Sequence, residues 1–125
     1  MRRSIVGGLS AALLFLGVAG VEAADIDVRT RPGPGPSTLI RLSGPLRQGD
    51  AEAMRQLLAR LKGQSAKAVV SPDAPLATVE LSSLGGDLIE GLKIGYLFRD
   101  YDVATVVRKK DICLSACALA FLGGT

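Results

Sequence analysis

Three side chains near the end of the chain have the types and spacing for chemistry: Ser115, Cys113 and Cys117. They interrupt a run of small and apolar residues that follows a charged approach. Such a run predicts a strand end that turns into a buried helix, with Ser115 at the first residues of the helix. Free N–H groups and the helix dipole favour developing negative charge at that position. It therefore suits either a helix-capping serine, which is the commoner case, or a nucleophile.

The two cysteines stand four residues apart, with Ser115 midway. In one regular helix their side chains would lie a turn apart on the same face, although Cβ directions there do not ideally suit a disulfide. We expect two buried thiols, with a disulfide or a redox pair of Cys113 and Cys117 as the alternatives. The chain has no histidine, and two sulfurs alone make a poor site, so no metal or other cofactor is expected.

Residues 1–23 have the pattern of a secretory signal peptide. Arg2 and Arg3 give the positive start, residues 5–21 are apolar, and V-E-A before Ala24 suits cleavage. We expect a periplasmic or secreted protein, held at a membrane only if this segment stays uncleaved. Export also implies oxidising conditions.

The charge balance argues against a nucleic-acid partner. Removal of residues 1–23 leaves 13 basic and 11 acidic residues, and no basic stripe is interleaved with aromatic residues. The length allows one domain.

The rest of the chain predicts an α/β domain. Residues 24–37 are expected to be an extended linker, because proline lacks a backbone donor and glycine lacks stiffness. Strands and helices then alternate between residues 38 and 125, which implies parallel strands with right-handed crossovers. The expected strands are 38–43, 77–82 and 102–108, with 68–70 a short strand or loop edge, and the expected helices are 50–62, 87–100 and one from Ser115.

Local signals refine two of these helices. Asp50 is expected to cap the first helix and Gly63 to end it in the left-handed conformation. Gly91 and Gly95 recur at helical spacing in the second helix. Glycine costs up to about 1 kcal/mol in a helix interior relative to alanine. The pair therefore predicts close packing of this helix on the sheet.

Two turns are expected to meet at one edge of the sheet. Gly85-Gly86 follows one strand, and Ser115 follows the next. In a parallel sheet the carboxyl ends of the strands lie together, and ligands bind there. The N–H groups of Gly86 and Ala116 would then form an oxyanion hole, in which loss of one donor costs about 2.7–4 kcal/mol of transition-state stabilisation.

Two segments resemble the Clp protease (ClpP/crotonase) superfamily. Residues 81–95 read L-S-S-L-G-G-D-L-I-E-G-L-K-I-G and are similar to the segment around that family's N-S-P-G-G-x-x-x-x-G motif. Residues 112–124 read I-C-L-S-A-C-A-L-A-F-L-G-G and are similar to its nucleophile segment. With the signal peptide, they look most like the periplasmic Clp-like proteins of the bacterial cell envelope. The resemblance covers about residues 38–125 and implies an incomplete ClpP/crotonase-like domain.

The resemblance implies Ser115 as nucleophile and Gly86 and Ala116 as oxyanion donors, in a serine hydrolase of peptidase type acting on a peptide or protein. The serine proteases of this family take a histidine from further along the chain, and this chain has none. A serine is weak without an adjacent base, so we expect this chain alone to be inactive. The alternative is a non-catalytic Clp-like binding or assembly module.

Departures from the family pattern lie close to the site. Leu84 replaces the proline before Gly-Gly, and Ala-Cys follows the serine in place of the typical glycine-containing pair. Lys109 and Lys110 are expected to be exposed charges rather than a base.

A parallel sheet needs cover on both faces. A partial domain therefore predicts exposed apolar edges and pairing with another chain, including a homo-oligomer.

Overall fold

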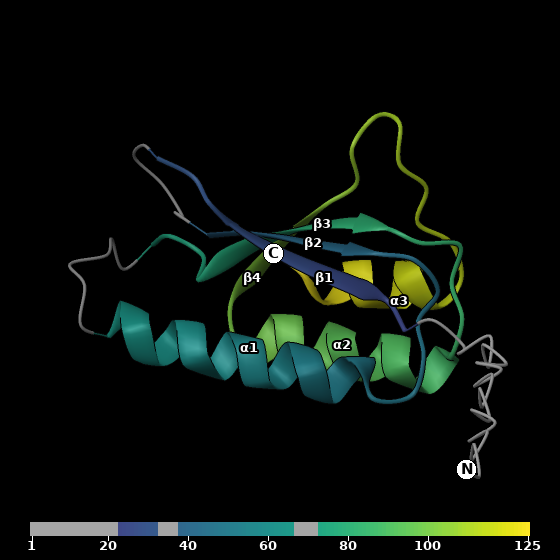
Figure 1. Ribbon diagram of the computed structural model, residues 1–125, viewed down its shortest axis with the longest axis horizontal. Coiled ribbons are helices and arrows are strands. Elements are labelled where there is room, and N and C mark those ends of the chain that lie inside the picture. The colour runs from purple at the N-terminus through teal and green to yellow at the C-terminus, as the bar shows by residue number, and fades with distance from the viewer. Residues whose placement is uncertain (1–22, 33–37, 67–72) are drawn as a thin grey trace, which may run out of the picture.

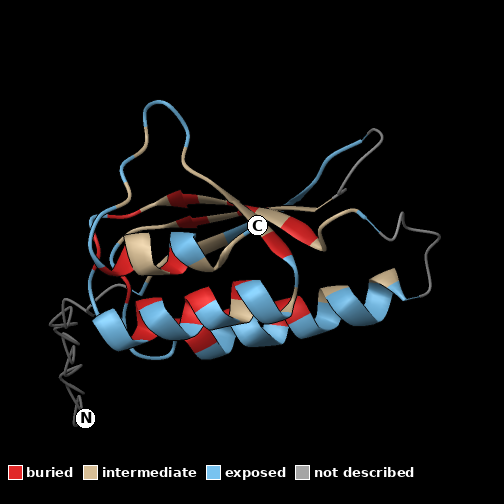
Figure 2. Cartoon of the chain, turned by 180° about the vertical axis from the view of Figure 1, so that it is seen from behind, coloured by how far each residue is buried: buried red, intermediate tan, exposed pale blue. Residues whose placement is uncertain are grey.

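The computed structural model describes residues 23–32, 38–66 and 73–125. These residues form one four-stranded sheet with three helices on one side of it (Figure 1; Figure 2). The elements are β1 Asp25–Thr30, β2 Thr38–Ser43, α1 Asp50–Ser65, β3 Ala77–Ser82, α2 Leu88–Asp100, β4 Val103–Val106 and α3 Ala116–Gly123. Within the described ranges no helix is both long and apolar enough to span a membrane. The predicted signal peptide of residues 1–23, apart from Ala23, and the short segment 68–70 lie outside the described residues.

The sheet has the order β1-β2-β3-β4, and β2, β3 and β4 are parallel. Helices α1 and α2 form the crossovers between these strands, so the predicted α/β alternation is confirmed. Strands β2 and β3 have the predicted bounds, whereas β4 is shorter than expected. Val79 pairs with Ile40 on one side and with Thr105 on the other, which sets the register. Alternate residues of β2 and β3 are buried against the helices.

The prediction of a linker was wrong for residues 25–30, which form strand β1. This strand pairs antiparallel with β2, from Asp25 opposite Ser43 to Thr30 opposite Thr38, and makes the sheet mixed. Its apolar residues alternate with polar ones, which is a strand pattern. The neighbouring prolines and glycines masked this signal, and residues 33–37 among them lie outside the described residues.

Both ends of α1 differ from the prediction. Gly49, at φ 100°, occupies the cap position, and Asp50 is the first helical residue. The buried Asp50 carboxylate accepts from the Arg47 N–H at 2.6 Å, so it holds the preceding turn instead of capping α1. Gly63 does not end the helix, because one glycine costs only about 1 kcal/mol. The helix continues to Ser65, whose hydroxyl donates to the Lys62 carbonyl at 3.1 Å.

The glycines of α2 pack against another helix and not against the sheet. A Cβ on Gly91 would overlap the Ala116 carbonyl, and one on Gly95 would lie 2.7 Å from the Leu119 carbonyl oxygen. Both views place α3 between α2 and the sheet (Figure 1; Figure 2). Close packing was therefore predicted correctly, but its partner was wrong. The sequence shows that Gly91 and Gly95 leave room beside α2, whereas only the tertiary fold determines which element packs there.

The sheet face away from the helices carries a charged cluster beside the half-buried apolar residues Leu39 and Val106. Arg41 of β2 pairs with Glu80 of β3 at 3.5 Å, and Arg108 pairs with the same carboxylate at 2.6 Å. Large apolar side chains are exposed on β1, on α2, on α3 and on the loops at one end of the sheet: Val28, Leu84, Leu88, Ile89, Leu92, Tyr96, Ile112, Leu114, Phe121 and Leu122.

The contact between α2 and α3 predicts opposite effects of two glycine-to-alanine changes. Gly91→Ala should lower the free energy of unfolding by about 1–3 kcal/mol, because the new methyl group overlaps the Ala116 backbone. Gly63→Ala is the matched control, since no atom lies within 4 Å of its Cβ position. It should raise stability by up to about 1 kcal/mol. Urea unfolding of both variants measures this, and equal effects would contradict the packing.

Candidate active site

Two backbone turns meet at the carboxyl ends of β2 and β3. Ser83, directly after β3, forms an isolated parallel bridge with Cys113. Its N–H donates to the Ile112 carbonyl at 2.7 Å, and its carbonyl accepts from the Leu114 N–H at 3.0 Å. These bonds hold segment 112–114 against the end of β3, as the sequence predicted for parallel strands.

The turn that contains Gly85 and Gly86, here called the glycine turn, directly contacts the turn that contains Ser115, here called the serine turn. A Cβ on Gly85 would lie 2.9 Å from the Ser115 Cβ and 3.4 Å from the Ser115 Oγ. Gly85 has φ 115°, which L side chains rarely adopt. The sequence predicted that Gly86 would approach the site, but the residue in contact with Ser115 is its neighbour Gly85. Only a residue without a side chain fits at this contact.

Gly86 packs on the opposite side of the turn. It forms an isolated bridge with Leu46, which lies between β2 and α1. The Leu46 N–H donates to the Gly85 carbonyl at 2.8 Å, and the Asp87 N–H donates to the Leu46 carbonyl at 2.9 Å. A Cβ on Gly86 would overlap the Leu46 backbone. The turn is therefore held by the Ser115 turn on one side and by Leu46 on the other.

Ser115 has a backbone conformation that L residues avoid. Its φ of 54° and ψ of −121° lie outside the regions allowed by sterics. The residue is exposed, precedes the first residue of α3, and its side chain forms no capping bond. Of the two roles that the sequence left open, capping is therefore not the one observed. A serine on a strained strand-to-helix turn is also the arrangement of the nucleophile elbow.

The two predicted donor residues differ in exposure: Gly86 is exposed, whereas Ala116 is fully buried. In the described part of the chain, neither the Gly86 N–H nor the Ala116 N–H donates to another residue. The Gly86 N–H lies between the two groups that bond to Leu46, and the Ala116 N–H is at the first residue of α3. Gly86 faces Leu46 while Gly85 lies against Ser115, so the oxyanion hole of Gly86 and Ala116 stays a prediction.

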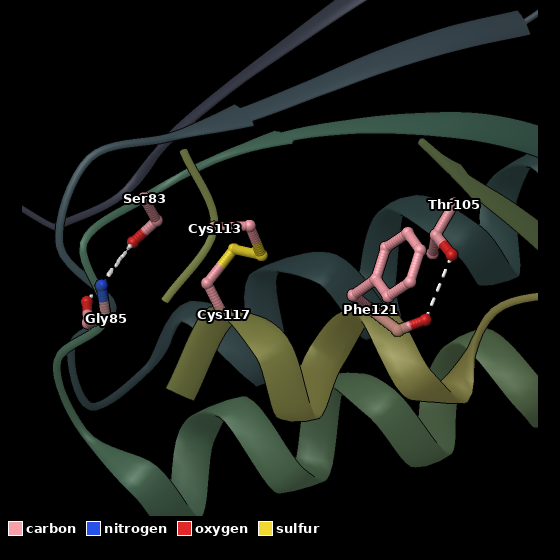
Figure 3. Close-up of a disulfide and its surroundings, with 6 residues drawn as sticks. All are labelled: Ser83, Gly85, Thr105, Cys113, Cys117 and Phe121. Atoms are coloured by element: carbon pink, nitrogen blue, oxygen red, sulfur yellow. Dashed lines mark hydrogen bonds between the residues drawn. A yellow bond between two sulfur atoms is a disulfide. The ribbon is translucent and has the colours of Figure 1, made fainter. Parts of the chain in front are cut away.

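Ser83 is a supporting residue that the sequence reasoning missed. Its buried hydroxyl accepts from the Gly85 N–H at 3.1 Å and lies 3.2 Å from the Gly85 carbonyl oxygen (Figure 3). A serine that bonds to the backbone two residues later is a known turn former. The signal was therefore present in the S-x-G spacing of residues 83–85.

Cys113 and Cys117 form a disulfide, so the expectation of two thiols was wrong (Figure 3). Their Cα atoms lie 5.1 Å apart. The objection to a disulfide applied only to two cysteines within one regular helix. Cys113 instead precedes α3 and pairs with Ser83, whereas Cys117 belongs to the first turn of α3. The turn at Ser115 changes the chain direction between them, which removes the objection from helix geometry.

The carboxylates near the glycine turn serve as helix caps. Asp87 accepts from the Glu90 N–H at 3.0 Å, at the start of α2. Glu90 is buried, accepts from the Ala51 N–H at 2.9 Å and pairs with Lys93 at 3.3 Å. Lys109 and Lys110 are exposed. Within the described ranges, no hydrogen bond joins the Ser115 hydroxyl to a side chain that would serve as a base.

An ion pair anchors the loop that leads to the site. Arg41 binds Asp111 through two contacts of 3.0 Å each, although the two residues are far apart in sequence. The Arg41 guanidinium holds the pKa of Asp111 below its ordinary value, and Asp111 in turn raises the pKa of Arg41. The loop 107–111 arches away from the helices (Figure 1) and is tied back at its end by this pair.

A hollow of about 430 Å³ lies beside the two turns, and Leu84, Ile112 and Lys110 contribute to its wall. A larger depression of about 530 Å³ lies between α1 and α2, and neither Ser115 nor the glycine turn lines it. In residues 23–32, 38–66 and 73–125, no cluster of three or more His, Cys, Asp or Glu side chains is arranged for a metal.

Comparisons of the chain with protein-family models, with curated proteins and with solved structures found no match.

The contact between Gly85 and Ser115 predicts that Gly85→Ala costs more stability than Gly49→Ala. Both positions have positive φ values, 115° and 100°, so each alanine pays about 1–3 kcal/mol of backbone strain. Only the change at Gly85 adds a clash, because no atom lies within 4 Å of the Cβ position of Gly49. Urea unfolding should show an additional loss of about 1–3 kcal/mol for Gly85→Ala. Equal losses would show that the turns do not touch.

The Arg41–Asp111 pair predicts a specific acid sensitivity. Because the pKa of Asp111 is lowered in the folded state, the pair stabilises the fold above the ordinary aspartate pKa of about 4. This stabilisation is lost as the pH falls through the lowered value. The difference in urea midpoint between the wild type and Asp111→Asn should therefore be largest near neutral pH and shrink in acid. In an Arg41→Gln background most of the pH-dependent difference should disappear, since only the smaller effects of Ser82 and Arg108 on Asp111 remain, and its persistence at full size would refute the assignment.

Proposed function

We propose that this chain is the N-terminal part of an exported Clp protease-like serine hydrolase of peptidase type, with a ClpP/crotonase-like domain. One observation carries the proposal: Ser115 is exposed, and its side chain does not cap α3. Its backbone has φ 54° and ψ −121°, and it lies directly against Gly85. A helix-capping serine has no need of that conformation, whereas a nucleophile at a sharp turn does. The motif resemblance of residues 81–95 and 112–124 points to the same reaction class.

In the proposed reaction the Ser115 Oγ attacks the carbonyl carbon of a peptide bond. A carbon–oxygen bond forms, the carbonyl oxygen becomes negative, and the hydroxyl proton moves to a base. The Gly86 and Ala116 N–H groups would bind the negative oxygen. Each such donor is worth about 2.7–4 kcal/mol in the transition state, because it is fixed before the reaction begins.

The described residues provide no general base for Ser115. The chain contains no histidine, and the nearby carboxylates Asp87 and Glu90 are engaged as caps. A base must therefore come from outside these residues before the serine can turn over substrate. We propose that this chain alone is inactive, and that it acts in the bacterial periplasm or outside the cell on a peptide or protein, in a homo-oligomer or with another chain.

The lack of histidine also favours a second candidate, a non-catalytic Clp-like binding or assembly module. Such a module keeps the fold and uses its exposed apolar residues, of which Leu84 is 74% and Leu122 is 68% exposed. It would have no use for a reactive Ser115. The reactivity of that hydroxyl therefore distinguishes the two candidates.

A fluorophosphonate probe tests the proposal on the full chain. The probe should form a stable adduct on Ser115 about 10²-fold faster than on an ordinary serine, because prearranged donors act even without a base. Mass spectrometry of digested protein locates the adduct. Ser115→Ala should abolish it, whereas Ser65→Ala, which removes an exposed hydroxyl at the end of α1, should leave it unchanged. Labelling of Ser115 no faster than of Ser65 would favour the binding module.

A further inference from the structure

The disulfide encloses the Ser115 turn and joins the two elements on either side of it. Cys113 is fixed to the end of β3 through its bridge to Ser83. Cys117 lies in the first turn of α3 and is 1% exposed, within the hydrophobic core. Figure 3 shows the sulfur–sulfur bond crossing from the strand-side segment to α3. The bond therefore sets how far apart the two ends of the turn can move.

Hydrogen bonds hold the same turn only in part. On the strand side, the Leu114 N–H donates to the Ser83 carbonyl at 3.0 Å. On the helix side, the Cys117 N–H donates to the Leu114 carbonyl at 3.0 Å, and the Leu119 N–H donates to the Ser115 carbonyl at 3.3 Å. A non-glycine residue at such a φ and ψ persists only when its surroundings over-determine it. The disulfide is the covalent member of that set of restraints.

We propose that Cys113 and Cys117 are positioning residues, whose disulfide keeps Ser115 in the strained conformation that presents its hydroxyl beside Gly85. Reduction of the bond lets the turn relax toward an allowed conformation, with the glycine turn losing its contact. The conformational part of this inference stands on the geometry alone. Its effect on the reactivity of Ser115 rests on the proposed hydrolase function.

The reduction requires an external dithiol. One reagent thiolate attacks the Sγ of Cys113, the less buried of the two residues, and Cys117 leaves as a thiolate that takes up a proton. The second reagent thiol then displaces Cys113, which also becomes a thiol. The protein disulfide gains two electrons and two protons, and the reagent is oxidised to its own disulfide.

Amide hydrogen exchange of the full chain, followed by NMR before and after treatment with dithiothreitol, tests the proposal. Reduction should speed exchange at the amides of Gly85, Leu114 and Cys117 about tenfold or more, since these donors depend on the geometry of the two turns. Amides in α1 should keep their protection. Unchanged exchange at the three amides would overturn the proposal. Loss of protection throughout the chain would also overturn it, because the bond would then be a general stabiliser.

Two variants separate positioning from simple loss of a crosslink. The double variant Cys113→Ala/Cys117→Ala should exchange like the reduced wild type. Ser115→Gly should respond to reduction several-fold less than the wild type, because glycine adopts the observed φ without strain. A response of Ser115→Gly equal to that of the wild type would contradict the positioning role.

The fluorophosphonate probe then separates this inference from the proposed function. If both hold, labelling of Ser115 falls about tenfold or more on reduction, in step with the exchange of the Gly85 amide. If exchange responds as expected but Ser115 is not labelled in either state, the disulfide positions the turn and the hydrolase proposal fails. Labelling that stays constant across both states overturns the positioning role and leaves the hydrolase proposal intact.

Discussion

The close approach of two backbone turns is the constraint on which the rest of this structure depends. Gly85 lies against Ser115 at a distance that leaves no room for a side chain. The approach is held from several directions at once. The Leu46 backbone hydrogen-bonds to the glycine turn, and the Ser83 hydroxyl binds the Gly85 N–H. The bridge between Ser83 and Cys113 holds the serine turn at the end of β3. Each restraint comes from a different part of the chain, so the site exists only in the folded protein.

The architecture was predictable because its signals are periodic. Strands β2 and β3 are short apolar segments bounded by turns, and their parallel order fixes where the two turns must meet. The strand β1 was missed because a period-2 pattern of six residues stands beside prolines and glycines that dominate the local composition. The disulfide was misjudged for a related reason. The objection from helix geometry holds only for two cysteines in one helix, whereas Cys113 precedes the turn at Ser115 and Cys117 follows it.

The meeting of the two turns was predictable from the parallel strands, whereas the contacts that support it were less so. Gly86 and Ala116 follow from the topology, since a turn after a strand and the first residue of a helix both offer unpaired N–H groups. The supporting contacts of Ser83 with Gly85 and of Arg41 with Asp111 join residues whose roles depend on the final packing. The φ and ψ of Ser115 distinguish this turn from a helix start with a capping serine side chain, and no pattern of residue types specifies them. The chemistry assigned to that turn remains our proposal.

The glycine stripe of α2 has a consequence for the site that is separate from stability. Gly91 lies against the backbone of Ala116, and Ala116 is the residue directly after Ser115. The closeness of the two helices therefore sets the position of the first peptide group of α3 relative to the sheet. A change in the distance between α2 and α3 would therefore also move the serine turn relative to the sheet.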